Sequence, residues 1–275
     1  MRRRRNPLLR GVLVTLAVVW SAFPILLIVL SSLKQPRQIF EVPPSLVFTP
    51  TLDNYRRLWE VWPGFYHNLT NSIVITTGAT LLTIAVSASA GYVYARYMSR
   101  GLAVSAFFMV VVRMLPPIIV TLPLFPAVNW LNLNDTHILL ILLYATFFVS
   151  LSTWIMRAFI AQIPVELEEA AIIDGATLRD RFFKVVLPLA AQGIVASAVF
   201  VLVFAWNEYI FAVIFTTRDA KTTPLIIAEI LSTAEGVEWG VLFAAATVQL
   251  VPILLLVVLL QRFIIAGLTA GSVKG

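Results

Sequence analysis

The charged residues of this sequence are few and unevenly placed. Only 12% of its 275 residues are charged and 60% are hydrophobic, yet the 23-residue stretch ELEEAAIIDGATLRDRFFKVVLP, residues 166–188, contains eight charges. Two further charges, Arg113 and Glu208, lie inside long apolar runs. A compact mixed-charge segment favours contact with water or with another protein. An isolated charge in an apolar run favours a polar partner or a water-filled cavity.

The sequence offers little for catalysis. It has no cysteine, which excludes disulfides, thiolate zinc sites and cysteine nucleophiles. His67 and His137 are far apart and without a ligand cluster, so we expect no metal site. The sequence contains no G-x-x-x-x-G-K-[ST] phosphate loop, so it cannot hydrolyse ATP by that route. We therefore expect no catalytic residue and no cofactor in this chain.

Composition predicts a membrane protein. A mean hydropathy of +0.91 and repeated apolar runs of about 20 residues are typical of membrane-spanning helices. Backbone amides in lipid must be bonded within their own segment, so the fold class is all-α. We predict one domain over residues 1–275 with six spans, at about 11–31, 72–95, 102–125, 138–159, 192–215 and 240–260.

The basic residues predict the orientation of these spans. With the N-terminus inside, thirteen Lys and Arg residues fall on the cytoplasmic side and six on the outer side, so both termini are expected in the cytoplasm. The net charge of +6 is then a topology signal and not a nucleic-acid footprint. The arginines at 2–5 also resemble a signal-peptide n-region, but no clear cleavage site follows, which favours an uncleaved first span.

The segment 164–188 lies between the fourth and fifth spans, on the cytoplasmic side. Pro164 suits the first turn of a helix, and Gly175 is placed to end it. Thr177 predicts the cap of a second helix, with Asp180 in its first turn and Lys184 one turn later. We expect a helix, a glycine turn and a second helix, on which Leu178, Phe182, Val185 and Leu189 share one face. This shape suits docking to another protein, whereas the alternative is a solvated loop.

The same segment resembles the EAA loop of ABC-importer permeases. That pattern is E-A-A, three residues, G, nine residues, I, one residue, L-P, and here it reads Glu169, Ala170, Ala171, then Gly175, then Val185, Leu187 and Pro188. Valine in place of isoleucine is the one departure. The stretches NSIVITTGATLLTIAVSASAGYVYAR, RMLPP, FAWNEYIFA and GLTAGSVKG extend the resemblance to the second permease of carbohydrate importers, the maltose-type MalG-like group.

The resemblance implies half of a channel in a bacterial inner membrane. Its expected partners are a second permease subunit, two ATPase subunits that bind ATP and Mg²⁺, and an extracytoplasmic solute-binding protein. In the family the EAA loop is inserted in a cleft of the ATPase and couples ATP-driven closure to alternating access. This role falls on the following residues: Glu166, Glu169, Ala170, Ala171, Asp174, Gly175, Leu187 and Pro188. The tail Gly271–Gly275 also reaches toward the ATPases by the same resemblance.

A substrate pathway is expected near the charges inside the spans. Glu208 lies beside Trp206 and Asn207, and a carboxylate, an aromatic ring and an amide together suit sugar hydroxyls and sugar faces. Arg113 is the second candidate, with a helix-bridging pair as the alternative for both charges. Prolines 116, 117, 123 and 126 predict a broken third span, which suits either a gate or a simple kink.

These observations predict a permease subunit that moves a mono- or oligosaccharide. A permease for a non-sugar solute fits the same features. An ion-coupled secondary transporter would need coupling carboxylates and repeated halves, whereas only Glu208 qualifies. A membrane-embedded enzyme would need a polar catalytic cluster inside the spans. Both of these rivals leave the segment 164–188 without a purpose.

Overall fold

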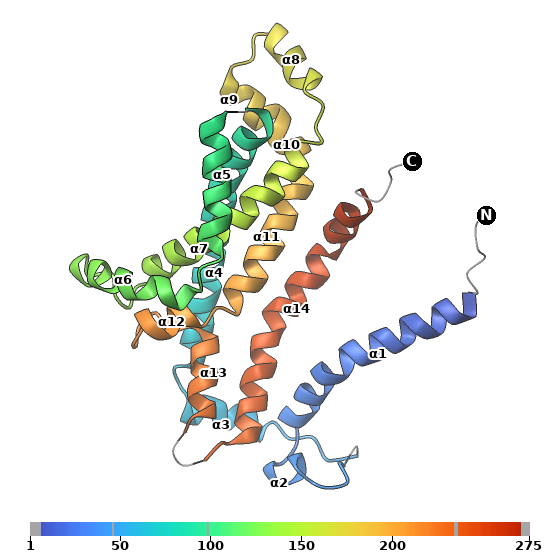
Figure 1. The fold of residues 1–275 in the computed structure, drawn as a ribbon. Helices are drawn as coiled ribbons and strands as arrows, with labels where there is room; N and C mark the ends of the chain where they lie inside the picture. Colours follow the sequence, from blue (N-terminus) through green and yellow to red (C-terminus); the bar gives the residue numbers. More distant parts are fainter. Residues whose placement is uncertain (1–6, 46, 98, 234–235, 271–275) are drawn as a thin grey trace. The chain divides into compact units, whose positions relative to one another are not determined.

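The protein is almost entirely helical, as predicted (Figure 1). The computed structural model describes residues 7–45, 47–97, 99–233 and 236–270. Within these ranges no β-strand occurs. The tail Gly271–Gly275 and the arginines at 2–5 lie outside the described residues. The helices are α1 (Pro7–Ser32), α2 (Pro36–Ile39), α3 (Asp53–Val61), α4 (Phe65–Arg96), α5 (Arg100–Arg113), α6 (Pro117–Trp130), α7 (His137–Ile160), α8 (Glu166–Ile173), α9 (Leu178–Asp180), the π-helix η1 (Arg181–Val186), α10 (Leu187–Leu189), α11 (Ala191–Trp206), α12 (Ile210–Phe215), α13 (Thr223–Leu231) and α14 (Trp239–Ala270).

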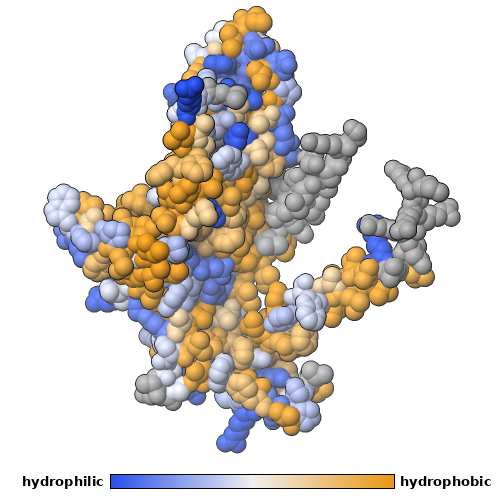
Figure 2. Space-filling model, viewed as in Figure 1, coloured by the Kyte–Doolittle hydropathy of each residue, from blue (hydrophilic) through white to orange (hydrophobic). Residues whose placement is uncertain are grey.

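Four of the described helices are long and apolar enough to cross a membrane by themselves. They contain the stretches Arg10–Ser32, Phe65–Arg96, His137–Ile160 and Trp239–Leu256. Two bent helix pairs, α5 with α6 and the run Leu178–Leu189 with α11, raise the number to six if each pair counts as one span. Figure 2 shows apolar surface along α1, as a helix facing lipid requires.

The predicted third and fifth spans are interrupted. α5 and α6 meet at an angle of 98° across residues 114–116, where Pro116 precedes Pro117 at the first position of α6. Proline lacks the backbone donor that would continue the helix, and it restricts the residue before it, so the break falls where the two prolines are adjacent. The fifth span ends as α11 at Trp206 and resumes as α12 at Ile210.

The chain forms two compact units, residues 1–67 with 226–252 and residues 68–225 with 253–275. The predicted single domain therefore stays a prediction. In the first unit, Leu58, Phe65, Ile226, Ile230 and Val241 form part of a buried cluster.

Within this first unit, one buried amide ties α3 to the segment that follows α1. Asn54 donates to the carbonyl of Ser32 at 2.7 Å and to that of Lys34 at 2.8 Å. Its side chain thus satisfies two backbone acceptors, one at the last residue of α1 and one just beyond it, where no helical partner remains for them.

In the second unit, α7 packs against α4, α5 and α11 (Figure 1). The core around α7 includes Ile75, Tyr144, Phe148 and Val201. A Cβ atom added at Gly91 of α4 would lie 2.7 Å from Met156 Cβ, so only glycine allows this approach of the two helices. The small side chains at this end of α4 therefore serve close helix packing.

Candidate functional site: the loop between α7 and α11

The first half of the loop is the helix α8, which begins at Glu166, two residues after the predicted start at Pro164, and ends before Gly175 as the sequence predicts. Glu166, Glu168 and Glu169 occupy its first turn, where carboxylates interact favourably with the helix dipole. Gly175 follows with φ +81°, a left-handed conformation that favours glycine, and its N–H donates to the carbonyl of Ile172 at 2.9 Å. The N–H of Ala176 closes the turn on the carbonyl of residue 171.

The second half begins at the predicted cap. Thr177 accepts a hydrogen bond from the N–H of Asp180, and the Asp180 carboxylate accepts one from the N–H of Thr177, both at 3.2 Å. Lys184 Nζ lies 2.6 Å from Asp180 Oδ1. The hydrogen bond from Lys184, followed by those from Thr177, lowers the pKa of Asp180 to about 2. The carboxylate is thus fully charged at neutral pH and holds the turn together.

The packing face of this half differs from the predicted one. Residues 181–186 form a π-helix, which has more residues per turn than an α-helix and so shifts the following side chains. Val186 is fully buried, whereas Leu178 and Leu189 are exposed. The predicted face of Leu178, Phe182, Val185 and Leu189 is therefore wrong, because it assumed α-helical periodicity throughout. Phe182 alone among the four packs on the buried cluster that contains Val186.

One buried carboxylate anchors α8 to α4. Glu168 accepts hydrogen bonds from the Tyr92 hydroxyl and from Arg96 Nε, each at 2.6 Å. The side chains of Arg96 and Glu168 are only 9% and 5% exposed. Arg96 also donates to the carbonyl of Ile163 at 2.9 Å, at the start of the loop. This buried ion pair fixes the loop at the end of α4, and removal of either partner would leave a charge without compensation.

The opposite side of α8 is open. The exposed residues include most of the predicted coupling set, namely Glu166, Glu169, Ala170, Asp174 and Gly175, and Ala171 is partly exposed. Three large apolar side chains of α8 accompany them, because Leu167 is 45%, Ile172 50% and Ile173 87% exposed. Figure 2 shows apolar and hydrophilic side chains side by side around α8, at the top of the view. An exposed face of small, acidic and β-branched residues on an anchored helix is suited to contact with another protein.

The last two predicted coupling residues lie at the far end of the loop. Leu187 packs against the buried cluster that contains Val186, and Pro188 follows it in α10. These two residues therefore lie where the loop joins α11, and not on the open side of α8.

Glu168, Tyr92 and Arg96 are not among the residues predicted from the sequence. Glu168 lies in the same acidic first turn as two exposed glutamates, and nothing in its type separates it from them. The available signal for this ion pair is the position of its residues in the sequence, since Arg96 and Glu168 follow two different predicted spans at the same membrane face. Opposite charges at such positions are candidates for pairing, but composition alone does not select this pair.

The structure gives Arg113 an aromatic environment. Its guanidinium carbon lies 5.8 Å from the ring centre of Phe147 and 5.7 Å from that of Phe200. It lines a cavity of about 360 Å³ whose other walls are mostly apolar. Within the described part of the chain, its buried Nη1 has no hydrogen-bond partner. Cation–π contacts therefore hold the side chain at the last residue of α5, directly before the break.

Glu208 has a local structural task. Its carboxylate accepts hydrogen bonds from the N–H groups of Phe211, at 3.0 Å, and Ala212, at 3.4 Å, and so caps α12. Asn207 is exposed and donates to the carbonyl of Val203, while Trp206 is buried. The predicted pathway role of residues 206–208 stays a prediction.

Phe211 connects the two candidate pathway charges. Its backbone bonds to Glu208, and its ring lies 5.9 Å from that of Phe147 and lines the cavity beside Arg113. Arg113 and Glu208 thus flank one aromatic cluster at the breaks of two spans. Among the described residues, no group of three or more His, Cys, Asp or Glu side chains could hold a metal ion.

Comparisons with known proteins identify the family. Residues 84–269 match the family described as binding-protein-dependent transport system inner membrane component. The chain is 38% identical to the trehalose transport system permease SugB of Mycobacterium tuberculosis, covering 96% of this chain and 97% of SugB. It is 32% identical to the trehalose/maltose transport system permease MalG of Thermococcus litoralis, covering 98% and 99% of the two chains.

A solved structure shares the fold. A bacterial ABC transporter involved in the import of the acidic polysaccharide alginate superposes with a TM-score of 0.76 at 19% identity, covering 93% of this chain and 95% of that one. The predicted all-α permease fold is thereby confirmed. By this evidence the chain belongs to the binding-protein-dependent transport system inner membrane components, and it is a permease subunit of an ABC importer.

Proposed function

We propose that α8 receives the movement of a partner ATPase and that the Glu168 anchor passes it to the spans. The observation that carries this proposal is the contrast between the two sides of α8, one fixed by a buried ion pair and the other exposed. If α8 contacted the rest of the protein only through solvated side chains, it could be displaced without displacing the spans. With Glu168 bonded to Tyr92 and Arg96, a displacement of α8 also displaces the end of α4.

A second connection leads to α11. Val186 is fully buried in a cluster with Tyr92 of α4 and with Met156 and Ile160 of α7. The chain continues from Val186 through α10 into α11. A push on the loop therefore acts on three spans together. Such coupled movement is what alternating access requires, because rigid groups of helices must rock around a central pathway.

The transported solute is a mono- or oligosaccharide. This part of the proposal rests on the relatives, which are named for trehalose, for trehalose and maltose, and, at 30% identity, for arabinooligosaccharides. Trp206, Asn207, Glu208 and Arg113 are the candidates for the pathway. Their surroundings of aromatic rings with a few polar groups suit sugar faces and hydroxyls.

The remaining subunits follow from the same proposal. A second permease, two ATPase subunits and an extracytoplasmic solute-binding protein complete the importer. The excess of Lys and Arg favours a cytoplasmic position for both termini and for the loop between α7 and α11, where ATP is available. The membrane is then the inner membrane of a bacterium.

Purification of the chain from its native membrane tests this function. We expect an ATPase and a second permease to co-purify, and we expect reconstituted vesicles to take up a sugar only when the ATPase side is supplied with ATP and the opposite side with the binding protein. Isolation of the chain alone, with ATP-independent transport, would instead support a secondary transporter.

A single substitution tests the coupling role of α8. The variant Glu169→Lys reverses an exposed charge on α8 and should abolish uptake while insertion into the membrane stays normal. Wild-type uptake by this variant would overturn the proposed coupling.

A further inference from the structure

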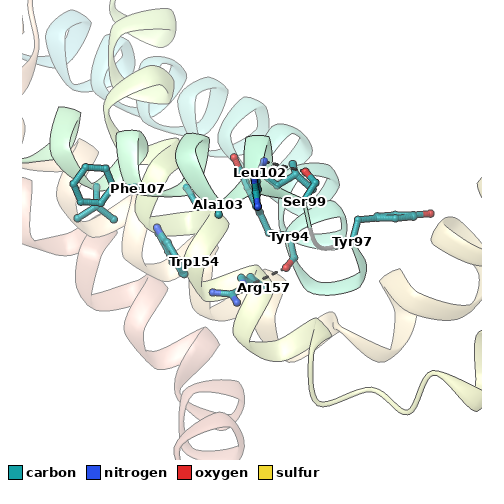
Figure 3. Close-up of a pocket in the computed structure, with 11 residues that line it drawn as sticks. Tyr94, Tyr97, Ser99, Leu102, Ala103, Phe107, Trp154 and Arg157 are labelled. Carbon is teal, nitrogen blue, oxygen red and sulfur yellow. Dashed lines mark hydrogen bonds between the residues drawn. The ribbon is translucent and has the colours of Figure 1, made fainter.

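A second cavity, separate from the coupling loop, lies where α4 ends, α5 begins and α7 ends. Its volume is about 820 Å³. Figure 3 shows residues that line it. Trp154 and Arg157 of α7 face Ala103 and Phe107 of α5 across it. The proposed transport function does not involve the residues that line this cavity.

One end of the cavity is cationic. Arg157 Nε donates to the carbonyl of Tyr94 at 3.2 Å, and its guanidinium lies 4.9 Å from the ring centre of Trp154. These contacts hold the side chain in place and leave its terminal amino groups available. Arg100, in the first turn of α5, lines the same cavity and is exposed. Within the described ranges, neither arginine forms an ion pair with an acidic side chain, so this end of the cavity is suited to an anion.

The rest of the cavity is apolar and elongated. Ala103, Ala106, Phe107 and Val110 line it at the spacing i, i+3, i+4 and i+7, so they form one stripe along α5. Val110 lies ten residues from Arg100, which is about 15 Å along a helix. Half of a bilayer's hydrocarbon core has the same depth of about 15 Å. The distance from Arg100 to the far end of the stripe at Val110 therefore matches the hydrocarbon depth of one leaflet.

The change from cationic to apolar follows the axis of α5, from Arg100 in its first turn to Val110. Arg, Trp and Tyr side chains are typical of the headgroup level, and here Arg100, Arg157, Trp154 and Tyr94 gather at the helix ends. We propose that this cavity binds an anionic glycerophospholipid of the phosphatidylglycerol class. Its phosphate lies between Arg100 and Arg157, and one acyl chain lies along the stripe. A free phosphate would leave the stripe unused, and a zwitterionic lipid would bring an amine close to two arginines.

Lipid retention tests the proposal directly. The full chain, purified with the subunits that accompany it, is incubated with dioleoyl phosphatidylglycerol or dioleoyl phosphatidylcholine and analysed by native mass spectrometry. We expect preferential retention of phosphatidylglycerol. In Arg100→Gln/Arg157→Gln that preference should fall roughly tenfold to thirtyfold, because each arginine near a headgroup contributes about 1 kcal/mol. The control Arg56→Gln/Arg218→Gln removes the same net charge from two exposed side chains outside the cavity and should retain the lipid as wild type does.

A second variant tests the acyl-chain contact separately from the headgroup contact. Ala106→Trp fills the stripe and leaves both arginines in place, so phosphatidylglycerol retention should fall in this variant too. An excess of inorganic phosphate should not displace the lipid from the wild-type protein. Equal retention of the two lipids by the wild type, or unchanged retention in both cavity variants, would overturn the proposal. Displacement by inorganic phosphate would also overturn it, because it would show a phosphate site without a lipid.

Discussion

A carboxylate fixes a loop at each end of α7, but the two do so differently. Before α7, Asp135 accepts hydrogen bonds from the backbone N–H groups of residues 217, 218, 219 and 220, at 2.9–3.2 Å. After α7, Glu168 accepts from the side chains of Tyr92 and Arg96. The backbone N–H of Asp135 adds a further bond to the carbonyl of Phe215, and its φ of +56° is one that aspartate tolerates.

We infer from this difference that the two ends of α7 have separate roles. Four backbone donors around one carboxylate fix the path of the loop that follows α12. Two side chains fix one point on α8 and leave its opposite side open to a partner. Under the proposed function, the loop fixed by Asp135 is a static connection, whereas α8, fixed by Glu168, transmits movement to the spans. Substitutions at the two ends should separate these tasks.

Removal of the anchor of α8 should have the largest effect. Glu168→Ala leaves the buried Arg96 without its counter-charge, which costs about 3–5 kcal/mol. We expect a large fall in the thermal midpoint of the purified protein and loss of ATP-driven uptake. In Arg96→Ala/Glu168→Ala the loss should be clearly smaller than the sum of the two single losses. Additive losses would show that the two side chains do not act as a pair.

Removal of the anchor before α7 should cost less and spare coupling. Asp135→Ala removes a charged acceptor from several N–H groups, and we expect a loss of about 2 kcal/mol. Hydrogen exchange at residues 217–220 should quicken, while ATP hydrolysis remains responsive to the solute. If hydrolysis became uncoupled in this variant, the proposed division of tasks would be wrong.

The Asp135 anchor also predicts a pH dependence. Burial would raise the pKa of Asp135, but the hydrogen bonds from Ala220, Asp219 and Thr217 prevail and lower it well below its usual range. Because the folded pKa is depressed, the stabilisation is fully present above the unfolded value of about 3.9 and is lost as pH falls toward the folded value. Protection of residues 217–220 should be constant between about pH 5 and 8. Loss of protection near neutral pH would contradict this assignment.

The glycine turn should give a smaller effect. A Cβ atom at Gly175 would meet nothing within 4 Å, so the cost of Gly175→Ala is conformational only, about 1 kcal/mol for an L-residue in the left-handed region. Gly175→Asn should cost less, because asparagine tolerates that region. We expect uptake rates to fall in the order Gly, Asn, Ala. Equal uptake by all three would show that the turn is not under conformational constraint.

The exposed ion pair between Asp180 and Lys184 should contribute least to stability. Lys184→Ala removes the partner of Asp180, but the lysine side chain is 77% exposed, and such pairs are screened by salt. The thermal midpoint should change less than in Gly175→Ala, and the difference should disappear at high salt. A loss that persists in high salt would indicate that Lys184 contacts a partner subunit.

Much of the loop between α7 and α11 could be predicted from local sequence rules. The end of α8, the turn at Gly175 and the cap at Thr177 depend on neighbouring residues, and the sequence contains all of them. The bent third span follows in the same way from adjacent prolines. The π-helix was not predictable, because a slightly wider turn leaves no signal in composition. The Glu168 and Asp135 anchors join residues 72 and more than 80 positions apart, and such pairings depend on the packing of the spans.

Cysteine accessibility tests most directly whether the exposed side of α8 docks on a partner ATPase. The chain has no cysteine, so Ile173→Cys introduces a single probe at a side chain that is 87% exposed. Thr217→Cys, at the other anchor, is the matched control. We predict that a bulky maleimide labels Ile173→Cys only after the ATPase has been removed, whereas it labels Thr217→Cys equally with and without the ATPase. Equal labelling of Ile173→Cys in the intact complex and in the stripped permease would contradict the docking of α8.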